Sequence, residues 1–124
     1  MTHAWIVDDD DEMSHAVVLM LRMLGLQAEV FREARSAART LMAGRKPDVL
    51  ILDINMPEVS GIDMLEFVRR TAHLKGLPVI MLSSETTDVQ VDEALAKGAN
   101  AFVFKPVTLE ELEGALKKVM PQKA

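Results

Sequence analysis

The sequence predicts an α/β fold, a doubly wound parallel sheet of five strands with five helices on both faces. Three observations support this prediction. Short apolar runs alternate with segments whose apolar residues recur at helical spacing, as in consecutive strand–helix–strand units. The run at 49–53 shows no alternation of polar and apolar residues, which is typical of a strand buried on both faces. Glycine, proline and serine residues mark turns between the segments.

The elements can be placed in order along the chain. The strands are predicted at residues 4–7, 28–31, 49–53, 78–82 and 101–104. The helices are predicted around the periodic apolar residues of 13–24, 37–42, 64–68, 91–95 and 109–119. Gly25, Gly44 and Gly98 follow three of these helices, as expected for residues that end a helix. Thr108 and Glu111 form the pattern of a capping box before the last helix.

Length and composition indicate one globular domain spanning residues 1–124. The net charge of −5 argues against nucleic acid or an anionic membrane as the direct partner. The absence of cysteine excludes disulfides, thiolate metal sites and cysteine catalysis. We see no signal peptide and no apolar run of membrane-spanning length, so we expect a cytoplasmic protein with no membrane contact.

Polar side chains follow four of the five predicted strands. They are Asp8, Asp9 and Asp10 after the first strand, Asp53 at the end of the third, Ser83 and Ser84 after the fourth, and Lys105 after the fifth. The ends of parallel strands meet at one edge of a sheet, so these residues should converge. Crowded carboxylates repel one another unless a cation intervenes, and Mg²⁺ prefers such oxygen ligands. A magnesium ion, an ammonium and a hydroxyl around one carboxylate would form a receptor for a phosphoryl group.

Each of these residues also has a simpler interpretation. The acidic run at 8–12 is typical of a helix start, and Asp53 alone could be a loop carboxylate or a cap. The two serines could form a turn, and Lys105 could be a solvated surface charge. Their coincidence at four strand ends favours a common site, because unrelated capping would rarely produce it.

The ordered set of motifs resembles the receiver domain of bacterial two-component response regulators. The resemblance covers essentially the whole chain. It is carried by Trp5-Ile6-Val7-Asp8-Asp9, Leu52-Asp53-Ile54-Asn55-Met56-Pro57, Gly61 and Lys105-Pro106. It implies a single receiver domain with a flavodoxin-like sheet in the strand order 2-1-3-4-5.

The resemblance also implies a role for each site residue. Asp53 would accept a phosphoryl group from a sensor histidine kinase or a phosphotransfer protein. Mg²⁺ would be held by Asp8, Asp9, Asp53 and the backbone carbonyl of Asn55. Lys105 would pair with the phosphoryl oxygens, and Ser83 would donate its hydroxyl to them. A cis peptide bond before Pro106 would aim Lys105 inward.

In the family, phosphorylation changes the surface made by the fourth helix, fifth strand and fifth helix. Ser83 would move toward the phosphoryl group, and Phe102 would turn inward, although Phe102 could equally be a static core residue. Ser83 replaces the commoner threonine, and Phe102 the commoner tyrosine. A downstream effector protein or domain would read the changed surface, which could also form a homodimer. Asn55 and Glu85 would flank the phosphate and could orient the hydrolytic water, giving a short-lived phosphoryl group.

Two other functions remain open from the residues. The first is a phosphatase resembling the haloacid dehalogenases, whose Asp-x-Asp pattern Asp8 and Asp10 superficially match. It also needs a late acidic pair at a strand end and room for a substrate cap, and the sequence offers neither. The second is a receiver-shaped interaction domain that is never phosphorylated. Such a domain should lack an acid or the lysine, and here all are present.

Overall fold

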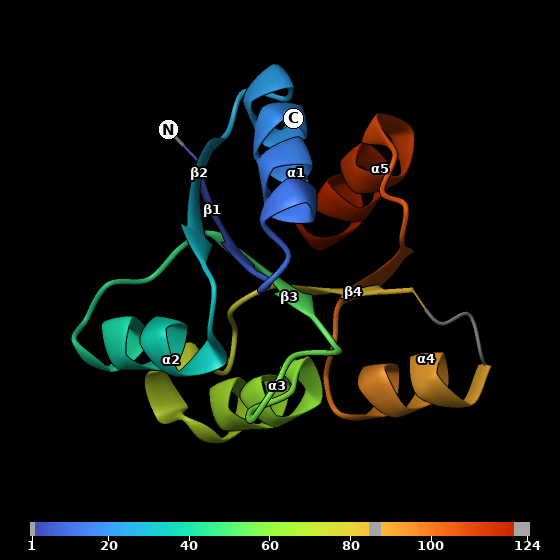
Figure 1. Ribbon diagram of the computed structural model, residues 1–124. Helices are drawn as coiled ribbons and strands as arrows, with labels where there is room; N and C mark the ends of the chain where they lie inside the picture. The colour runs from blue at the N-terminus through green and yellow to red at the C-terminus, as the bar shows by residue number, and fades with distance from the viewer. Residues whose placement is uncertain (1, 85–87, 121–124) are drawn as a thin grey trace.

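A computed structural model describes residues 2–84 and 88–120, with the backbone alone for residues 88–90. Five strands form one parallel sheet in the order β2-β1-β3-β4-β5, which confirms the predicted fold (Figure 1). The strands are β1 (His3–Val7), β2 (Gln27–Phe31), β3 (Val49–Asp53), β4 (Val79–Ser83) and β5 (Ala101–Phe104). The helices are α1 (Asp11–Met23), α2 (Ala34–Met42), α3 (Gly61–Arg70), α4 (Asp88–Ala96) and α5 (Leu109–Val119), with a short 3₁₀ helix η1 (Ala72–Leu74).

The helices cover the sheet in two layers. Helices α1 and α5 lie on one face, and α2, α3 and α4 lie on the other (Figure 1). The central strand β3 is buried along its whole length. Its side chains alternate between the layers: Leu50 and Leu52 pack in the core under α2 and α3, whereas Val49 and Ile51 pack under α1 and α5. This two-sided burial explains why the strand reads as an unbroken apolar run.

Three strands differ from the sequence prediction by one residue: β1 and β2 begin one residue earlier, and β4 is shifted one residue toward the carboxyl end; the helix η1 is additional. Strand β4 begins at Val79 because Pro78 has no N–H to donate, although its carbonyl still accepts a hydrogen bond from Leu50. The helix η1 was not predicted, because three residues are too few to show a periodic pattern. None of the helices in the described part of the chain is long and apolar enough to span a bilayer.

The parallel register brings the strand ends to one edge. Val7 of β1 pairs with Leu52 of β3, and Asp53 pairs with Leu82 of β4. At the next step, Ser83 pairs with Phe104 of β5. The residues that leave these strands therefore start from neighbouring positions.

Candidate functional site

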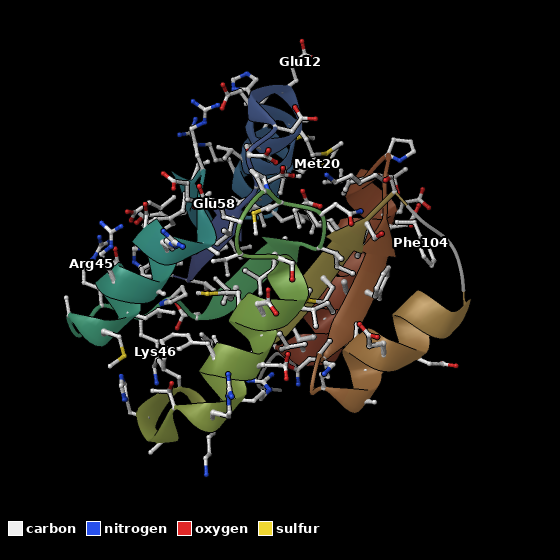
Figure 2. The ribbon with its side chains drawn as sticks, turned by 60° about the horizontal axis from the view of Figure 1, so that its bottom comes forward. Glu12, Met20, Arg45, Lys46, Glu58 and Phe104 are labelled. Carbon is white, nitrogen blue, oxygen red and sulfur yellow. The ribbon has the colours of Figure 1, made fainter. Side chains whose placement is uncertain are left out.

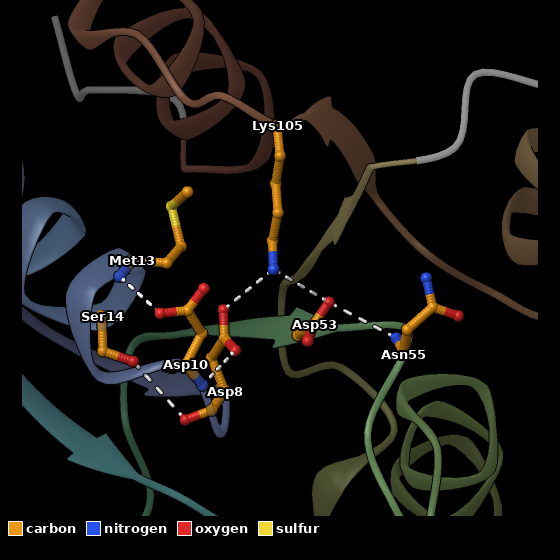
Figure 3. Close-up of polar contacts among 7 residues, drawn as sticks. All are labelled: Asp8, Asp10, Met13, Ser14, Asp53, Asn55 and Lys105. Atoms are coloured by element: carbon orange, nitrogen blue, oxygen red, sulfur yellow. Dashed lines mark hydrogen bonds and ion pairs between the residues drawn. The ribbon is translucent and has the colours of Figure 1, made fainter.

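Four strand ends supply the polar side chains of the site. Asp8 follows β1 directly, Asp53 is the last residue of β3, and Ser83 is the last residue of β4. Lys105 follows β5, and its side chain extends toward the two aspartates (Figure 3). Asp8, Asp53 and Ser83 are all buried polar residues. The predicted convergence is therefore confirmed for Asp8, Asp53 and Lys105, which are far apart in the sequence.

Asp8 is fully buried, and both of its carboxylate oxygens have partners (Figure 3). Oδ1 accepts a hydrogen bond from the backbone N–H of Asp10 at 2.9 Å. Oδ2 accepts one from the ammonium of Lys105 at 3.2 Å. These contacts compensate the charge of a carboxylate that has no exposure to water.

Lys105 bridges the two buried carboxylates. Its Nζ lies 3.2 Å from Asp8 Oδ2 and 3.3 Å from Asp53 Oδ1. Burial alone would lower the pKa of Lys105, but the negative charges of Asp53 and Asp8 outweigh burial and raise it. The ammonium is therefore held in its charged form beside Asp53. The peptide bond between Lys105 and Pro106 is cis, as the resemblance implied.

Asp53 lies in an environment that disfavours its charged form. Burial, and then the nearby charge of Asp8, raise its pKa from 3.8 to about 6. Lys105 and the backbone N–H of Asn55, which donates to Asp53 Oδ1 at 3.4 Å, act in the opposite direction but are weaker. An additional cation at this carboxylate would lower its pKa again and favour the nucleophilic, ionised form.

Three carboxylates are positioned to share a cation. One oxygen each from Asp8, Asp9 and Asp53 lies within 4.8 Å of the others. Asp8 and Asp53 are buried, whereas Asp9 is exposed, so a bound ion would keep access to water. Lys105 pairs with Asp8 and Asp53 only, so the three carboxylates carry more negative charge than this one lysine compensates. The all-oxygen donor set and the open side fit Mg²⁺, which retains several waters.

A hollow of about 350 Å³ opens beside this group. Its lining includes Asp9, Arg32, Met56, Pro57 and Glu58. Glu58 adopts a left-handed backbone conformation with φ 66°, in the loop that leads from β3 to α3. The site is thus reached from the side of α2 and this loop.

Asp10 does not belong to the group. Its side chain accepts a hydrogen bond from the backbone N–H of Met13 at 3.1 Å and caps α1, as expected of a helix-start residue. Ser14 was missed by the sequence reading. It is buried, and its hydroxyl donates a 3.5 Å hydrogen bond to the Asp8 carbonyl. A hydroxyl among the apolar positions Val17, Val18 and Leu21 of α1 was the available signal.

The start of α3 packs against the backbone of Asp53. Ser60 and Asp63 form a reciprocal capping box, and Gly61 lies directly against the backbone carbonyl of Asp53. The Ser-x-x-Asp pattern of residues 60–63 is the sequence signal for this cap. The box that had been predicted is only half formed: Thr108 accepts from the Glu111 N–H, while the Glu111 carboxylate accepts from the Thr108 hydroxyl.

The structure places most of the remaining predicted residues at or near the ends of β3, β4 and β5. The backbone carbonyl of Ser83 accepts a 2.8 Å hydrogen bond from the Lys105 N–H, which ties β4 to the lysine. Asn55 is exposed next to Asp53. Phe102 is half-buried in β5, with its ring centroid 5.1 Å from that of Phe104. Glu85 lies outside the described residues.

Comparison with known proteins agrees with this geometry. A family model described as the response regulator receiver domain matches residues 4–117. The chemotaxis protein CheY of Pseudomonas aeruginosa is 35% identical over 114 residues, which cover 92% of this chain and 92% of the relative.

Solved structures give the same result. The chemotaxis protein CheY4 of Vibrio cholerae superimposes with a TM-score of 0.87 at 30% identity, covering 97% of this chain and 99% of that one. A putative response regulator from Chloroflexus aurantiacus gives a TM-score of 0.91 at 27% identity, covering 98% of each chain.

Proposed function

This chain belongs to the response regulator receiver family, whose members are phosphoacceptor switches rather than metabolic enzymes, and on that premise we propose that Asp53 is its phosphoacceptor. One observation supports this assignment above the others. The Asp53 carboxylate both pairs with Lys105 and belongs to the three-carboxylate cluster with Asp8 and Asp9. Family membership implies a histidine kinase as partner; a sensor kinase or a phosphotransfer protein as the immediate donor is part of the proposal.

In the proposed reaction, an Asp53 oxygen forms a bond to phosphorus. The phosphorus–nitrogen bond of a phosphohistidine breaks, and the imidazole leaves with the electron pair and takes up a proton. Lys105 would pair with the phosphoryl oxygens, and Ser83 would donate its hydroxyl to them. Asp8, Asp9, Asp53 and the backbone carbonyl of Asn55 would hold Mg²⁺. When bound, this ion would neutralise charge on the carboxylates and the phosphoryl group.

The output would be a change of surface. Ser83 and Phe102 would move when the phosphoryl group is present, and the face made by α4, β5 and α5 would be read by an effector protein or domain. The same face could form a homodimer. Asn55 and Glu85 would shorten the phosphoryl lifetime by orienting the hydrolytic water. The proposal includes a cytoplasmic location and the absence of direct contact with nucleic acid or membrane, both of which rest on the family and the acidic composition.

The test is incubation with Mg²⁺ and acetyl phosphate, followed by intact-mass measurement. The wild type should gain one phosphoryl group, and Asp53→Asn should gain none. Asp10→Asn is the matched control, because asparagine caps a helix as well as aspartate and Asp10 lies outside the cluster. It should be modified like the wild type.

Other outcomes would overturn the proposal. An adduct that survives in Asp53→Asn but is lost in Asp8→Asn would indicate phosphatase-like chemistry. A wild type that is modified neither by acetyl phosphate nor by a panel of phosphorylated histidine kinases would indicate an interaction domain without phosphorylation. Loss of the adduct over many hours rather than minutes would contradict only the role assigned to Asn55 and Glu85.

A further inference from the structure

Strand β5 carries two aromatic rings in contact. The centroids of Phe102 and Phe104 lie 5.1 Å apart, with the ring planes tilted by 51°. Residues two apart on a strand point to the same face of the sheet, so the rings form a pair along β5. Both are half-buried, and Phe104 stands at the carboxyl end of the strand, on the same side of the molecule as α4 (Figure 2).

Phe104 is next to two of the residues that would contact the phosphoryl group. It pairs in register with Ser83, and Lys105 is the next residue in the chain. The Lys105 N–H donates to the Ser83 carbonyl at 2.8 Å, so β4 and β5 are joined at this point. Any displacement of Ser83 or Lys105 therefore acts directly on the backbone that carries Phe104.

Phe102 connects the pair to the outer surface. Together with Gly114 and Lys118, it lines a hollow of about 240 Å³ between β5 and α5. It also packs against the core that includes Met81 and Ala94. A change in the position of its ring would alter both the hollow and this packing, whereas Phe104 contacts Phe102 from the side of the site.

We propose that Phe104 is a second switch residue, whose ring holds Phe102 in its present position and so sets how readily the domain responds to phosphorylation. This inference rests on the proposed function. A tilted aromatic pair at this distance favours one arrangement by about 2- to 10-fold over the same residues apart. Removing the Phe104 ring should shift the equilibrium of Phe102 by that factor, and a ligand that favours the other position would then need less free energy to reach it.

The experiment follows the ring of Phe102 directly. The chain has four phenylalanines, so labelling with 4-fluorophenylalanine gives few ¹⁹F resonances, which single substitutions assign. Wild type, Phe104→Leu and Phe104→Tyr are titrated with beryllofluoride, a phosphoryl mimic, in Mg²⁺. The control is Phe31→Leu, which removes a comparable pair at the other edge of the sheet: Trp5 and Phe31 lie 4.6 Å apart with the same 51° tilt.

We expect Phe104→Leu to shift the Phe102 resonance before ligand is added and to lower the half-saturating beryllofluoride concentration by about 2- to 10-fold. Phe104→Tyr keeps the ring and should behave like the wild type, as should Phe31→Leu. An unchanged or raised half-saturation in Phe104→Leu would overturn the inference, whether or not the resonance shifts, because the loss of a ring 5.1 Å away shifts the resonance by its ring current alone. A wild type that binds no beryllofluoride and forms no adduct would instead refute the proposed function, which distinguishes that failure from a failure of the inference.

Discussion

The side chain of Asp53 is 5% exposed and shares Lys105 with the fully buried Asp8. A carboxylate in this position is costly when charged, because burial and the neighbouring acid both raise its pKa to about 6. The same environment keeps Lys105 charged and aimed at Asp53. The residue that is proposed to react is therefore also one whose ionised form lowers the stability of the folded state.

This cost predicts that Asp53→Asn stabilises the protein. A pKa of about 6, against an ordinary value of 3.8, means that the folded state binds this proton more tightly than the unfolded state. Stability is therefore lost as the pH rises from about 4 to 6, by up to about 3 kcal/mol. Without divalent cations at pH 7.5, we expect Asp53→Asn to raise the free energy of unfolding by about 1–3 kcal/mol.

Urea denaturation in EDTA at several pH values measures this difference, which should shrink as the pH falls toward 4. Asp10→Asn removes an exposed carboxylate and keeps the helix cap, so its effect should stay near zero throughout. A destabilised Asp53→Asn at pH 7.5 would show that Lys105 compensates the Asp53 charge fully.

At the scale of elements, the start of α3 determines how the end of β3 is presented. The first helical residue, Gly61, has its Cα so close to β3 that an added Cβ would collide with the Asp53 carbonyl oxygen. It would also lie 2.9 Å from the Ile54 Cα. Because these neighbours are backbone atoms, they cannot move aside as a flexible side chain would. Glycine is required here for close approach, and not for an unusual φ.

Two glycine-to-alanine substitutions should therefore have opposite effects. Gly61→Ala should lower the free energy of unfolding by about 1–3 kcal/mol, as overpacking does, and should slow phosphorylation by displacing Asp53. Gly114→Ala, within α5, meets no atom within 4 Å. It should stabilise by about 0.5–1 kcal/mol through helix propensity. Denaturant titrations and the acetyl phosphate assay measure both effects, and a neutral Gly61→Ala would contradict the observed packing of α3 on β3.

Helix α4 is fixed at its carboxyl end by α3. The Arg69 guanidinium donates to the Gly98 carbonyl at 2.9 Å and to Asn100 Oδ1 at 2.6 Å. Lys97 also pairs with Glu66 at 3.4 Å. Gly98 and Asn100 precede β5, so these contacts lie at the amino ends of the strands. The site lies at the opposite, carboxyl ends. The carboxyl end of α4 is therefore tied to α3 by both hydrogen bonds and an ion pair.

At the scale of the whole molecule, the fold and the centre of the site could both be predicted from the sequence, and for the same reason. Unbroken apolar runs identify parallel strands, and parallel strands bring their ends together, so Asp8, Asp53 and Lys105 could be predicted to meet. Contacts that depend on the angle between packed elements could not be predicted in this way. Arg69 reaches Asn100 only because α3 ends beside the start of β5. The contact of Phe104 with Phe102 is not predictable from the sequence either, because the spacing indicates a shared face but not that the two rings touch.

The same convergence links metal binding to the stability of the entire domain. Asp8 and Asp9 follow β1 and Asp53 ends β3, and these strand ends are brought together only in the folded sheet. Mg²⁺ should therefore bind the folded state in preference to the unfolded one. At 100 times its dissociation constant, it should raise the free energy of unfolding by about 2.7 kcal/mol, and a chelator should remove the whole increment.

Thermal unfolding with and without Mg²⁺, at constant ionic strength, measures this linkage. Asp9→Asn should lose most of the increment, because Asp9 is the exposed member of the cluster and the fold does not depend on its burial. Asp10→Asn should keep it, since Asp10 caps α1 outside the cluster. The net charge of −5 allows weak nonspecific cation binding, and ionic strength matched with K⁺ controls for it. Equal stabilisation of the wild type and Asp9→Asn would place the ion outside the three-carboxylate cluster.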